Sequence, residues 1–120
     1  MYNKIEFGID IVDISRIQKL IDTFGSRFLS RIFSQREVAE AKQKGHFTQS
    51  LSGKFAAKEA FIKTCSTDEI PCISFSDIEI LSDKNGKPSC FFQGSKKENL
   101  SLSISHEQTY AVAGIIRFIA

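Results

Sequence analysis

The 120-residue sequence has no tryptophan, one methionine, two prolines and two histidines. It also lacks the patterns GxxxxGK[ST], GxGxxG, HExxH and GxSxG, which argues against a P-loop, Rossmann, zincin or α/β-hydrolase protein. The longest apolar run, AVAGII, is far shorter than the roughly 20 residues that a membrane-spanning helix needs. Since no apolar N-terminal segment is present either, we predict a cytoplasmic protein that does not act at a membrane.

Cysteine is scarce as well. Cys65, Cys72 and Cys90 show no CxxC spacing and are odd in number, which is typical of free thiols in a reducing compartment. Hydrophobic residues make up 42% of the chain and charged residues 25%, so a globular protein is expected. The length predicts one domain over residues 1–120, with a small core that subunit contacts would supplement.

Positive charge is concentrated in one part of the chain. From Arg16 to Lys63 there are ten Lys or Arg and four Asp or Glu, whereas the rest of the chain has six and ten. The net charge is nevertheless only +2. This asymmetry predicts a basic surface for an acidic protein, a nucleic acid or a phosphate-bearing ligand, and does not choose among them.

The N-terminal half begins with a strand pattern and continues with helical patterns. Apolar and polar residues alternate from Ile5 to Ile11, which predicts a strand with one buried face. Helical spacing follows, with Asp13 as the N-cap, and SRFLSRIF predicts a short second helix. Ser34 and Glu37 form a capping box, which predicts a third helix that ends at Gly45.

After Pro71 the apolar period becomes two. FSDIEIL and SCFFQ flank SDKNGKP, whose Asn85-Gly86 pair predicts a hairpin turn. LSLSIS and YAVAGIIRFI are expected to be further strands. We therefore predict an α+β fold in which an antiparallel sheet packs against helices.

The segment SGKFAAKEAFIK, residues 52–63, is part of a helix expected from about residue 48, and its charges are lopsided. Lys54, Lys58 and Lys63 surround the single carboxylate of Glu59. The simple explanation is a solvated face, on which Glu59 and Lys63 form a salt bridge worth about 0.2–0.5 kcal/mol. Alternatively, the carboxylate holds a cation while the lysines, two of which repel each other at i,i+4, meet a polyanion.

Asp10 lies in the otherwise apolar first strand, beside Gly8, which leaves room for a close approach. A strand aspartate that faces solvent is the simple explanation. The alternative is a metal ligand, because Mg²⁺ is usually held by one or two carboxylates together with waters and phosphates. Asp10 and Glu59 would form such a pair if the helix crosses that end of the strand.

His106 follows the strand LSLSIS, and a histidine at a strand end is most often structural or exposed. Alternatively, it reaches a phosphate or a hydroxyl together with Ser105. Lys87, which follows the hairpin turn, would also reach a phosphate, although a solvated lysine is the simpler explanation there.

Several segments together resemble holo-acyl-carrier-protein synthase, of the 4′-phosphopantetheinyl transferase superfamily. They are, in family order from about Phe7 to Ile116, GIDIVDISRI, GKFAAKEAFIK, FSDIEIL, NGKP, LSISHE and YAVAGII. The resemblance implies transfer of the 4′-phosphopantetheine arm of coenzyme A to a serine of apo-acyl carrier protein, for fatty acid biosynthesis, with release of adenosine 3′,5′-bisphosphate. It also implies a Mg²⁺ ion on the pyrophosphate and a homotrimer whose active sites lie between subunits.

The resemblance also implies roles for single residues. Asp10 and Glu59 match metal ligands, Lys58 matches a lysine that assists the departing phosphate, and all three are expected to be catalytic. The general base is either Asp10 or a metal-bound water. The residues expected to bind coenzyme A are Lys54, Lys63, Thr67, Asn85, Gly86, Lys87, Pro88, Ser105 and His106. The residues expected to dock the acidic carrier protein are Arg16, Arg27, Phe28 and Arg31.

This chain departs from the family pattern at three places, one of which is the short segment GSKKEN before LSISHE. Lys54 replaces an arginine, which gives up bidentate phosphate binding. The loop CSTDEIPC keeps Thr67 of a Gly-Thr-Gly loop but has Ser66 and Asp68 at the glycine positions. One alternative is therefore a degenerate member without transfer activity. The other alternative is a basic module that holds nucleic acid, although no RNA-binding signature is present. We favour an active enzyme, in which Asp68 and Glu69 turn outward.

Overall fold

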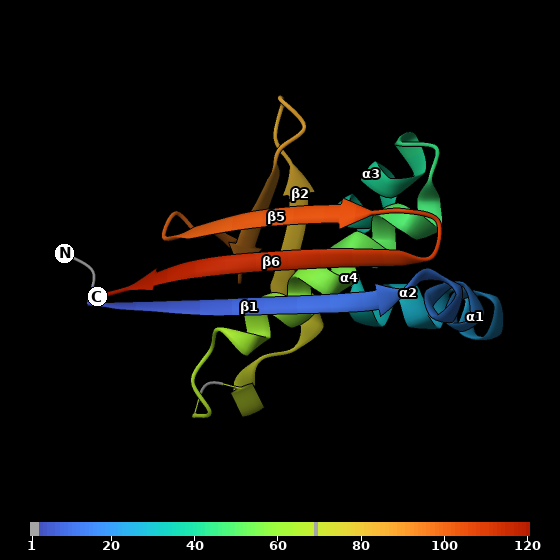
Figure 1. Cartoon of the computed structure of the whole chain (residues 1–120). Helices are drawn as coiled ribbons and strands as arrows, with labels where there is room; N and C mark the ends of the chain where they lie inside the picture. Colours follow the sequence, from blue (N-terminus) through green and yellow to red (C-terminus); the bar gives the residue numbers. More distant parts are fainter. Residues whose placement is uncertain (1–2, 69) are drawn as a thin grey trace.

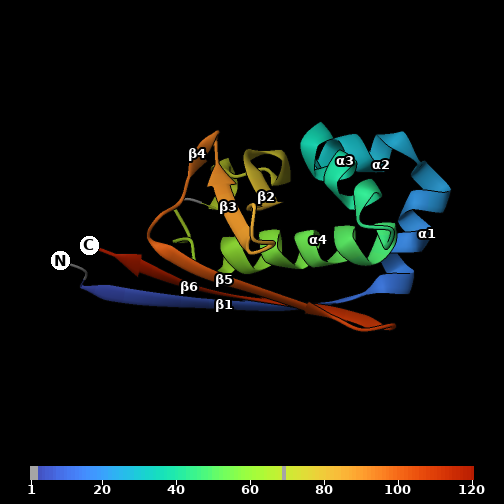
Figure 2. The same cartoon turned by 90° about the horizontal axis from the view of Figure 1, so that it is seen from above.

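Helix α4 (Phe47–Lys63) lies between two antiparallel sheets in the computed structural model, which describes residues 3–68 and 70–120. The first sheet has the strand order β1-β6-β5 and consists of β1 (Lys4–Asp13), β5 (Leu100–His106) and β6 (Tyr110–Ile119). The second has the order β2-β3-β4 and consists of β2 (Ile78–Ser82), β3 (Pro88–Phe92) and β4 (Ser95–Lys96). Figures 1 and 2 show α4 lying on the first sheet, with the second sheet on its other side. The predicted α+β fold is confirmed.

The other helices begin where the sequence predicts. Asp13 Oδ1 accepts a hydrogen bond from the Ser15 N–H at 2.9 Å and caps α1 (Ile14–Phe24). Gly25, with a φ of 54°, then separates α1 from α2 (Ser26–Ile32). The capping box of Ser34 and Glu37 is present and starts α3 (Gln35–Gln43). Within the described part of the chain, no helix is long and apolar enough to cross a bilayer.

The connections after α4 are short. Two 3₁₀ turns, η1 (Ile70–Cys72) and η2 (Phe75–Asp77), lead into β2. The predicted hairpin joins β2 to β3, and Gly86 adopts a φ of 84° in its turn. β4 was not predicted, and it pairs with the end of β3 through only two residue pairs.

Helix α4 is buried on nearly all sides, so a solvated face does not explain Lys54 and Lys58, although Lys63 at its end is exposed. Residues 51–58, together with Ala60 and Phe61, are all buried. A helix enclosed in this way normally carries apolar residues all round. Lys54 and Lys58 are exceptions, at 4% and 0% exposure, and a buried ammonium requires partners.

Strand β1 has the predicted alternation, but its apolar face is not buried within this chain. Ile5, Phe7, Ile9 and Ile11 are between 55% and 64% exposed. The covered face of β1 is instead the one that carries Gly8 and Val12, against α4. The prediction of one buried face was therefore wrong for a single chain, because the apolar side chains point away from its own core.

Candidate active site

A close approach between β1 and α4 positions the first group of candidate residues. A Cβ atom at Gly8 would lie 2.0 Å from the Ala60 carbonyl oxygen, so only glycine allows the helix backbone to lie this near the strand. Side chains two residues apart in a strand share a face, and Asp10 therefore lies on the α4 side of β1. Glu59 precedes Ala60 in α4, which brings the two carboxylates to the same strand–helix junction.

Asp10, Glu59 and Lys63 form a charged cluster at this junction. The Lys63 ammonium donates to Asp10 Oδ1 at 3.2 Å and to the Ile9 carbonyl oxygen at 2.8 Å. Burial and then the negative charge of Asp10 raise the pKa of Glu59, while Lys63 and Arg16 act in the opposite direction. The influence of Asp10 on Glu59 indicates that these carboxylates lie near each other, as the sequence predicts.

This cluster has the donor set of a magnesium site rather than a structural metal site. Among the described residues no three His, Cys, Asp or Glu side chains gather in a way that would enclose a metal ion. Structural zinc sites take four such ligands, whereas Mg²⁺ is commonly held by one or two carboxylates and completes its shell with water and phosphate oxygens. Asp10 and Glu59 are the residues that could hold it.

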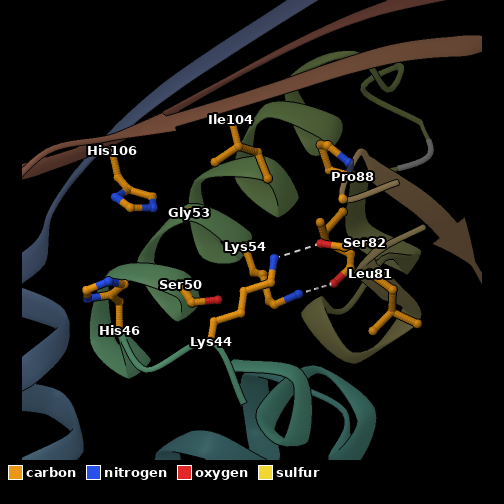
Figure 3. Close-up of a pocket in the computed structure, with 12 residues that line it drawn as sticks. Lys44, His46, Ser50, Gly53, Lys54, Leu81, Ser82, Pro88, Ile104 and His106 are labelled. Atoms are coloured by element: carbon orange, nitrogen blue, oxygen red, sulfur yellow. Dashed lines mark hydrogen bonds between the residues drawn. The ribbon is translucent and has the colours of Figure 1, made fainter. Parts of the chain in front are cut away.

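A second group of candidate residues lines a cavity of about 200 Å³ on the other side of α4. Four predicted coenzyme A contacts are among the lining residues, namely Lys54, Gly86, Pro88 and His106. In Figure 3 the His46 and His106 rings lie on one side of the cavity and Pro88 and Ser82 on the other, with lysines between them. The cavity therefore joins residues from α4, β2, β3 and β5 that are far apart in the sequence.

Two lysines give this cavity its charge, and both are partly engaged. The Lys44 ammonium donates to Ser82 Oγ at 2.8 Å. Lys54 donates to the Ile80 carbonyl oxygen and to Glu40 Oε1, both at 2.6 Å. Burial acts to raise the pKa of Glu40, but the hydrogen bonds from Lys54 and from the Ser82 N–H outweigh it and lower that pKa. Glu40 thus offsets part of the positive charge that an anionic ligand would meet.

Sequence reasoning missed several residues of this cavity: Lys44, His46, Ser50 and Ser82. Lys44 and His46 flank Gly45 at the end of α3, in the part of the chain with excess positive charge. That excess was the available signal, but it does not single out these two residues. Ser50 and Ser82 carry no recognisable motif.

Lys58 lies apart from both groups. Its side chain is fully buried, and its ammonium is bound to Glu37 and to two backbone carbonyl oxygens. This environment argues against the expected role at a departing phosphate, because no donor of the ammonium is left facing solvent.

Other predicted contacts of coenzyme A lie outside the cavity. Ser105 is exposed on the opposite sheet face from Ile104 and His106, because neighbouring strand residues point to opposite sides. Within one chain it therefore does not act beside His106. Asn85 is exposed in the hairpin turn, and Lys87 lines a neighbouring cavity between β3 and β5.

The altered loop follows α4 directly. Thr67 and Asp68 are exposed in its turn, so Asp68 is accessible to solvent as expected. Glu69, whose side chain was also expected to turn outward, lies outside the described residues.

The predicted docking residues gather at α1 and α2. A hollow of about 220 Å³ is lined by Leu20, Phe24, Arg27, Phe28 and Arg31. Phe24 is 49% exposed, so an apolar surface lies beside the two arginines. Arg16 lies in the first turn of α1, close enough to Glu59 to lower its pKa. The site and the basic surface are therefore neighbours.

The carboxylate cluster and the cavity lie at opposite edges of the first sheet. Asp10 is on the edge strand β1 and pairs with Ala113 of the central strand β6, which pairs in turn with Ile104 of the other edge strand, β5. His106 ends β5. Helix α4 lies over this sheet (Figure 2) and contributes Glu59 and Lys63 to the first group and Lys54 to the second.

Residues 6–114 match the family model described as ACPS, 4′-phosphopantetheinyl transferase superfamily. A protein named holo-[acyl-carrier-protein] synthase from Halothermothrix orenii is 41% identical over 117 residues, covering 91% of this chain and 93% of the relative. A protein of the same name from Chloroherpeton thalassium is 40% identical over 116 residues, covering 93% of this chain and 96% of the relative.

Solved structures agree with these sequence relatives. The crystal structure of a holo-(acyl-carrier-protein) synthase from Bacillus anthracis in complex with CoA (3′,5′-ADP) matches with a TM-score of 0.79 at 36% identity, covering 96% of both chains. That of holo-[acyl-carrier-protein] synthase from Helicobacter pylori in complex with coenzyme A matches with a TM-score of 0.74 at 32% identity, covering 93% of this chain and 98% of the other.

Proposed function

The chain belongs to the 4′-phosphopantetheinyl transferase superfamily, and we propose that it transfers the 4′-phosphopantetheine arm of coenzyme A to a serine of an apo-acyl carrier protein in fatty acid biosynthesis. The serine oxygen bonds to the phosphorus next to the pantetheine arm, the bond from that phosphorus to the nucleotide breaks, and adenosine 3′,5′-bisphosphate leaves. The observation that carries this proposal is the cluster of Asp10, Glu59 and Lys63 at the junction of β1 and α4.

The residue types at the cluster suit this reaction. Phosphoryl transfer depends mainly on positioning and on neutralising the charge of the phosphate oxygens. Asp10 and Glu59 would hold Mg²⁺, which supplies positive charge to the pyrophosphate when it is bound. Lys63 is more than half exposed and adds a positive charge beside the carboxylates. Asp10 is also a candidate to accept the proton of the serine hydroxyl.

The cavity beside Lys54 and His106 is proposed to bind the nucleotide end of coenzyme A. Lysines and histidines are suitable partners for its phosphates, and Gly86 and Pro88 form an uncharged wall. Its volume of about 200 Å³ is below the roughly 300–1,000 Å³ of typical ligand sites. One chain therefore does not enclose all of coenzyme A, and Lys63, Thr67, Asn85, Lys87 and Ser105 remain proposed contacts around it.

We propose a homotrimer in which neighbouring subunits complete each active site; the number three comes from the family resemblance. The exposed apolar face of β1 supports assembly, because a contiguous row of isoleucine and phenylalanine side chains favours contact with another copy. The placement of the two residue groups at opposite edges of the sheet supports a shared site. Assembly would bring the cavity of one copy beside the carboxylates of the next.

A mixing experiment tests the shared site. Asp10→Asn removes one carboxylate of the cluster and His106→Glu places a negative charge in the cavity, so each variant alone should be strongly impaired. If subunits mix at random and each site joins two subunits, about a quarter of the sites in refolded mixtures regain both intact halves. Activity that stays at the level of the separate variants, in mixtures shown to contain mixed oligomers, would contradict the shared site.

The surface of α1 and α2 is proposed to bind the carrier protein. Arg27 and Arg31 lie four residues apart on α2 and flank the apolar hollow with Phe28. An acidic helical partner would meet both the charges and the apolar surface. Replacing Arg16, Arg27 and Arg31 by Glu should weaken carrier-protein binding far more than coenzyme A binding, and added salt should lower the wild-type association rate.

Mass spectrometry tests the proposed reaction directly. Apo-acyl carrier protein incubated with coenzyme A, Mg²⁺ and this protein should gain the mass of the phosphopantetheine arm, and chelation of the metal should stop the gain. Binding of coenzyme A and carrier protein without a mass increase would favour a degenerate member. Salt-dependent binding of nucleic acid without coenzyme A binding would favour the basic module.

A further inference from the structure

The ammonium of Lys58 is enclosed by three elements that surround α4. It donates to the carbonyl oxygen of Ile32, at the end of α2, at 2.6 Å, and to the carbonyl oxygen of Phe75, in η2, at 3.1 Å. Its third partner is Glu37 Oε1 of α3, at 2.7 Å. The ring of Phe33 lies 5.1 Å away. An ammonium has three N–H donors, so all of them are used inside the protein.

Glu37, the acidic partner of Lys58, is equally buried and holds three elements together. Its Oε1 also accepts the Ser34 N–H at 2.9 Å, which completes the capping box of α3. Its Oε2 accepts the Ile80 N–H of β2 at 2.8 Å. The Lys58–Glu37 pair thus joins α4 to α2, α3, η2 and β2. Removing one partner would leave a buried charge without compensation.

Lys58 faces away from the carboxylate cluster although it precedes Glu59. Successive residues in an α-helix point about 100° apart, and Glu59 points toward β1 while Lys58 points toward α2 and α3. We propose that Lys58 is a positioning residue, which holds α2, α3 and β2 against α4 through Glu37 and does not touch coenzyme A. This inference rests on the proposed function, because it concerns which lysines of the transferase reach its substrate.

The pair acts on the cavity through its neighbours. One helical turn before Lys58, Lys54 of α4 binds Glu40 of α3. Lys54 also donates to the carbonyl oxygen of Ile80 in β2. The N–H of the same Ile80 donates to Glu37. These contacts fix where α3 and β2 lie, and the ends of those elements supply Lys44 and Ser82 to the cavity. Loss of the Lys58–Glu37 pair should therefore disturb binding of coenzyme A more than the chemical step.

A rescue experiment separates positioning from catalysis. Lys58→Met should lower the melting temperature by roughly 10 °C or more, because the buried carboxylate of Glu37 loses its cationic partner. Adding Glu37→Gln removes the buried carboxylate. The amide oxygen of the new glutamine can still accept a backbone N–H, and its amide nitrogen can donate to one of the carbonyl oxygens that Lys58 had bound. We expect the double variant to melt above the single variant. Below its melting temperature it should keep kcat within about tenfold of wild type, with the larger change in the KM for coenzyme A.

The matched control makes the same substitution at Lys63, the exposed lysine at the end of the same helix. Lys63→Met removes the ammonium of a side chain that is 52% exposed, so it should lower kcat while changing the melting temperature little. A folded Lys58→Met/Glu37→Gln variant whose kcat falls by a hundredfold or more, with KM unchanged, would overturn the proposal, because that is the size of loss when a group that stabilises the transition state is removed.

Lysine labelling of the wild-type protein gives a second test that does not depend on a folded variant. With an acetylating reagent and peptide mass spectrometry, Lys63 should react and be protected by coenzyme A with Mg²⁺, whereas Lys58 should stay unreactive with or without them. Labelling of Lys58 that coenzyme A prevents would overturn the proposal. A wild-type protein that transfers nothing refutes the proposed function instead, and the melting temperatures and labelling still decide the position of Lys58.

Discussion

The lysines on the two sides of α4 differ in solvent exposure and in their partners. On the side of β1, the Lys63 side chain is 52% exposed and lies over two carboxylates. On the side of α3, Lys54 and Lys58 are 5% and 0% exposed, and each is paired with a glutamate of α3. One side thus has a charge that a ligand could use, whereas on the other side Lys58 only holds the protein together and Lys54 does so while it also lines the cavity.

This difference is decided by the neighbouring layers rather than by the helix itself. Strand β1 comes close to α4 at Gly8 and brings an aspartate, while α3 runs alongside with Glu37 and Glu40 spaced to meet two lysines one turn apart. A lysine-rich helix therefore has no single interpretation. The acidic residues that another element places beside each lysine determine whether it is structural or available.

The largest expected effect comes from removing a carboxylate on the β1 side. Asp10→Asn or Glu59→Gln should lower kcat by at least roughly 100- to 1,000-fold while the protein stays folded, because either change removes a charge that the proposed metal site requires. Glu79→Gln, on the α3 side, is the matched control and should lower kcat less than tenfold. Comparable losses in all three variants would mean that the two sides of α4 do not differ in function.

The next effect concerns the close approach of β1 to α4. Gly8→Ala would place a Cβ 2.0 Å from a backbone oxygen, so the strand and helix must separate, and kcat/KM should fall by about 100-fold through misplacement of Asp10. On the other side of α4, Gly53→Ala would place its Cβ 2.8 Å from Ile104 Cγ2, the end of a side chain that can move. Both residues line the cavity, so that variant should mainly raise the KM for coenzyme A and keep most of its kcat; an equal loss of kcat would contradict the special role of Gly8.

Local patterns predicted most of the fold. Caps at Asp13 and Ser34, the hairpin at Asn85-Gly86 and the final strands all depend on neighbours in the sequence, and the structure confirms them. The family resemblance is confirmed too, by matches that cover nearly the whole chain. These features were predictable because a few consecutive residues encode them.

The environment of the lysines was not predictable in the same way. The role expected for Lys58 came from the family resemblance, but its environment depends on Glu37, 21 residues earlier, and on two carbonyl oxygens. The buried face predicted for β1 failed for a related reason. The alternation was read correctly, yet the apolar face is uncovered within one chain, and the sequence does not say what covers it.

A smaller effect should be seen in the stability of the metal-free protein. Burial and Asp10 raise the pKa of Glu59, so the folded state holds that proton more tightly and its ionised form opposes folding. This cost is present at neutral pH and disappears below the ordinary glutamate pKa of about 4.3. Glu59→Gln should therefore raise the melting temperature slightly near pH 7 and leave it unchanged near pH 3.5. Mg²⁺ should stabilise the wild type alone.

The smallest effect is expected at the outermost charge pair of the α3 side, between Arg36 and Glu79. The Arg36 side chain is 69% exposed, and exposed ion pairs contribute little to stability. Burial acts to raise the pKa of Glu79, but hydrogen bonds from Arg36 and Ser34 outweigh it, so that pKa is lowered. The stabilisation is then present above the ordinary glutamate pKa and is lost as the pH falls through the lowered value.

Arg36→Gln should accordingly lower the melting temperature by about 1–4 °C at pH 7 in low salt. The difference from wild type should shrink at high salt and again at acidic pH, where Glu79 is protonated, and transfer activity should be unaffected. Thermal unfolding at two pH values and two salt concentrations measures the loss of stability and its dependence on salt and on pH. A loss as large as that expected for Lys58→Met would show that solvent exposure does not rank the charge pairs around α4, and that the outer pair is as important to the fold as the buried one.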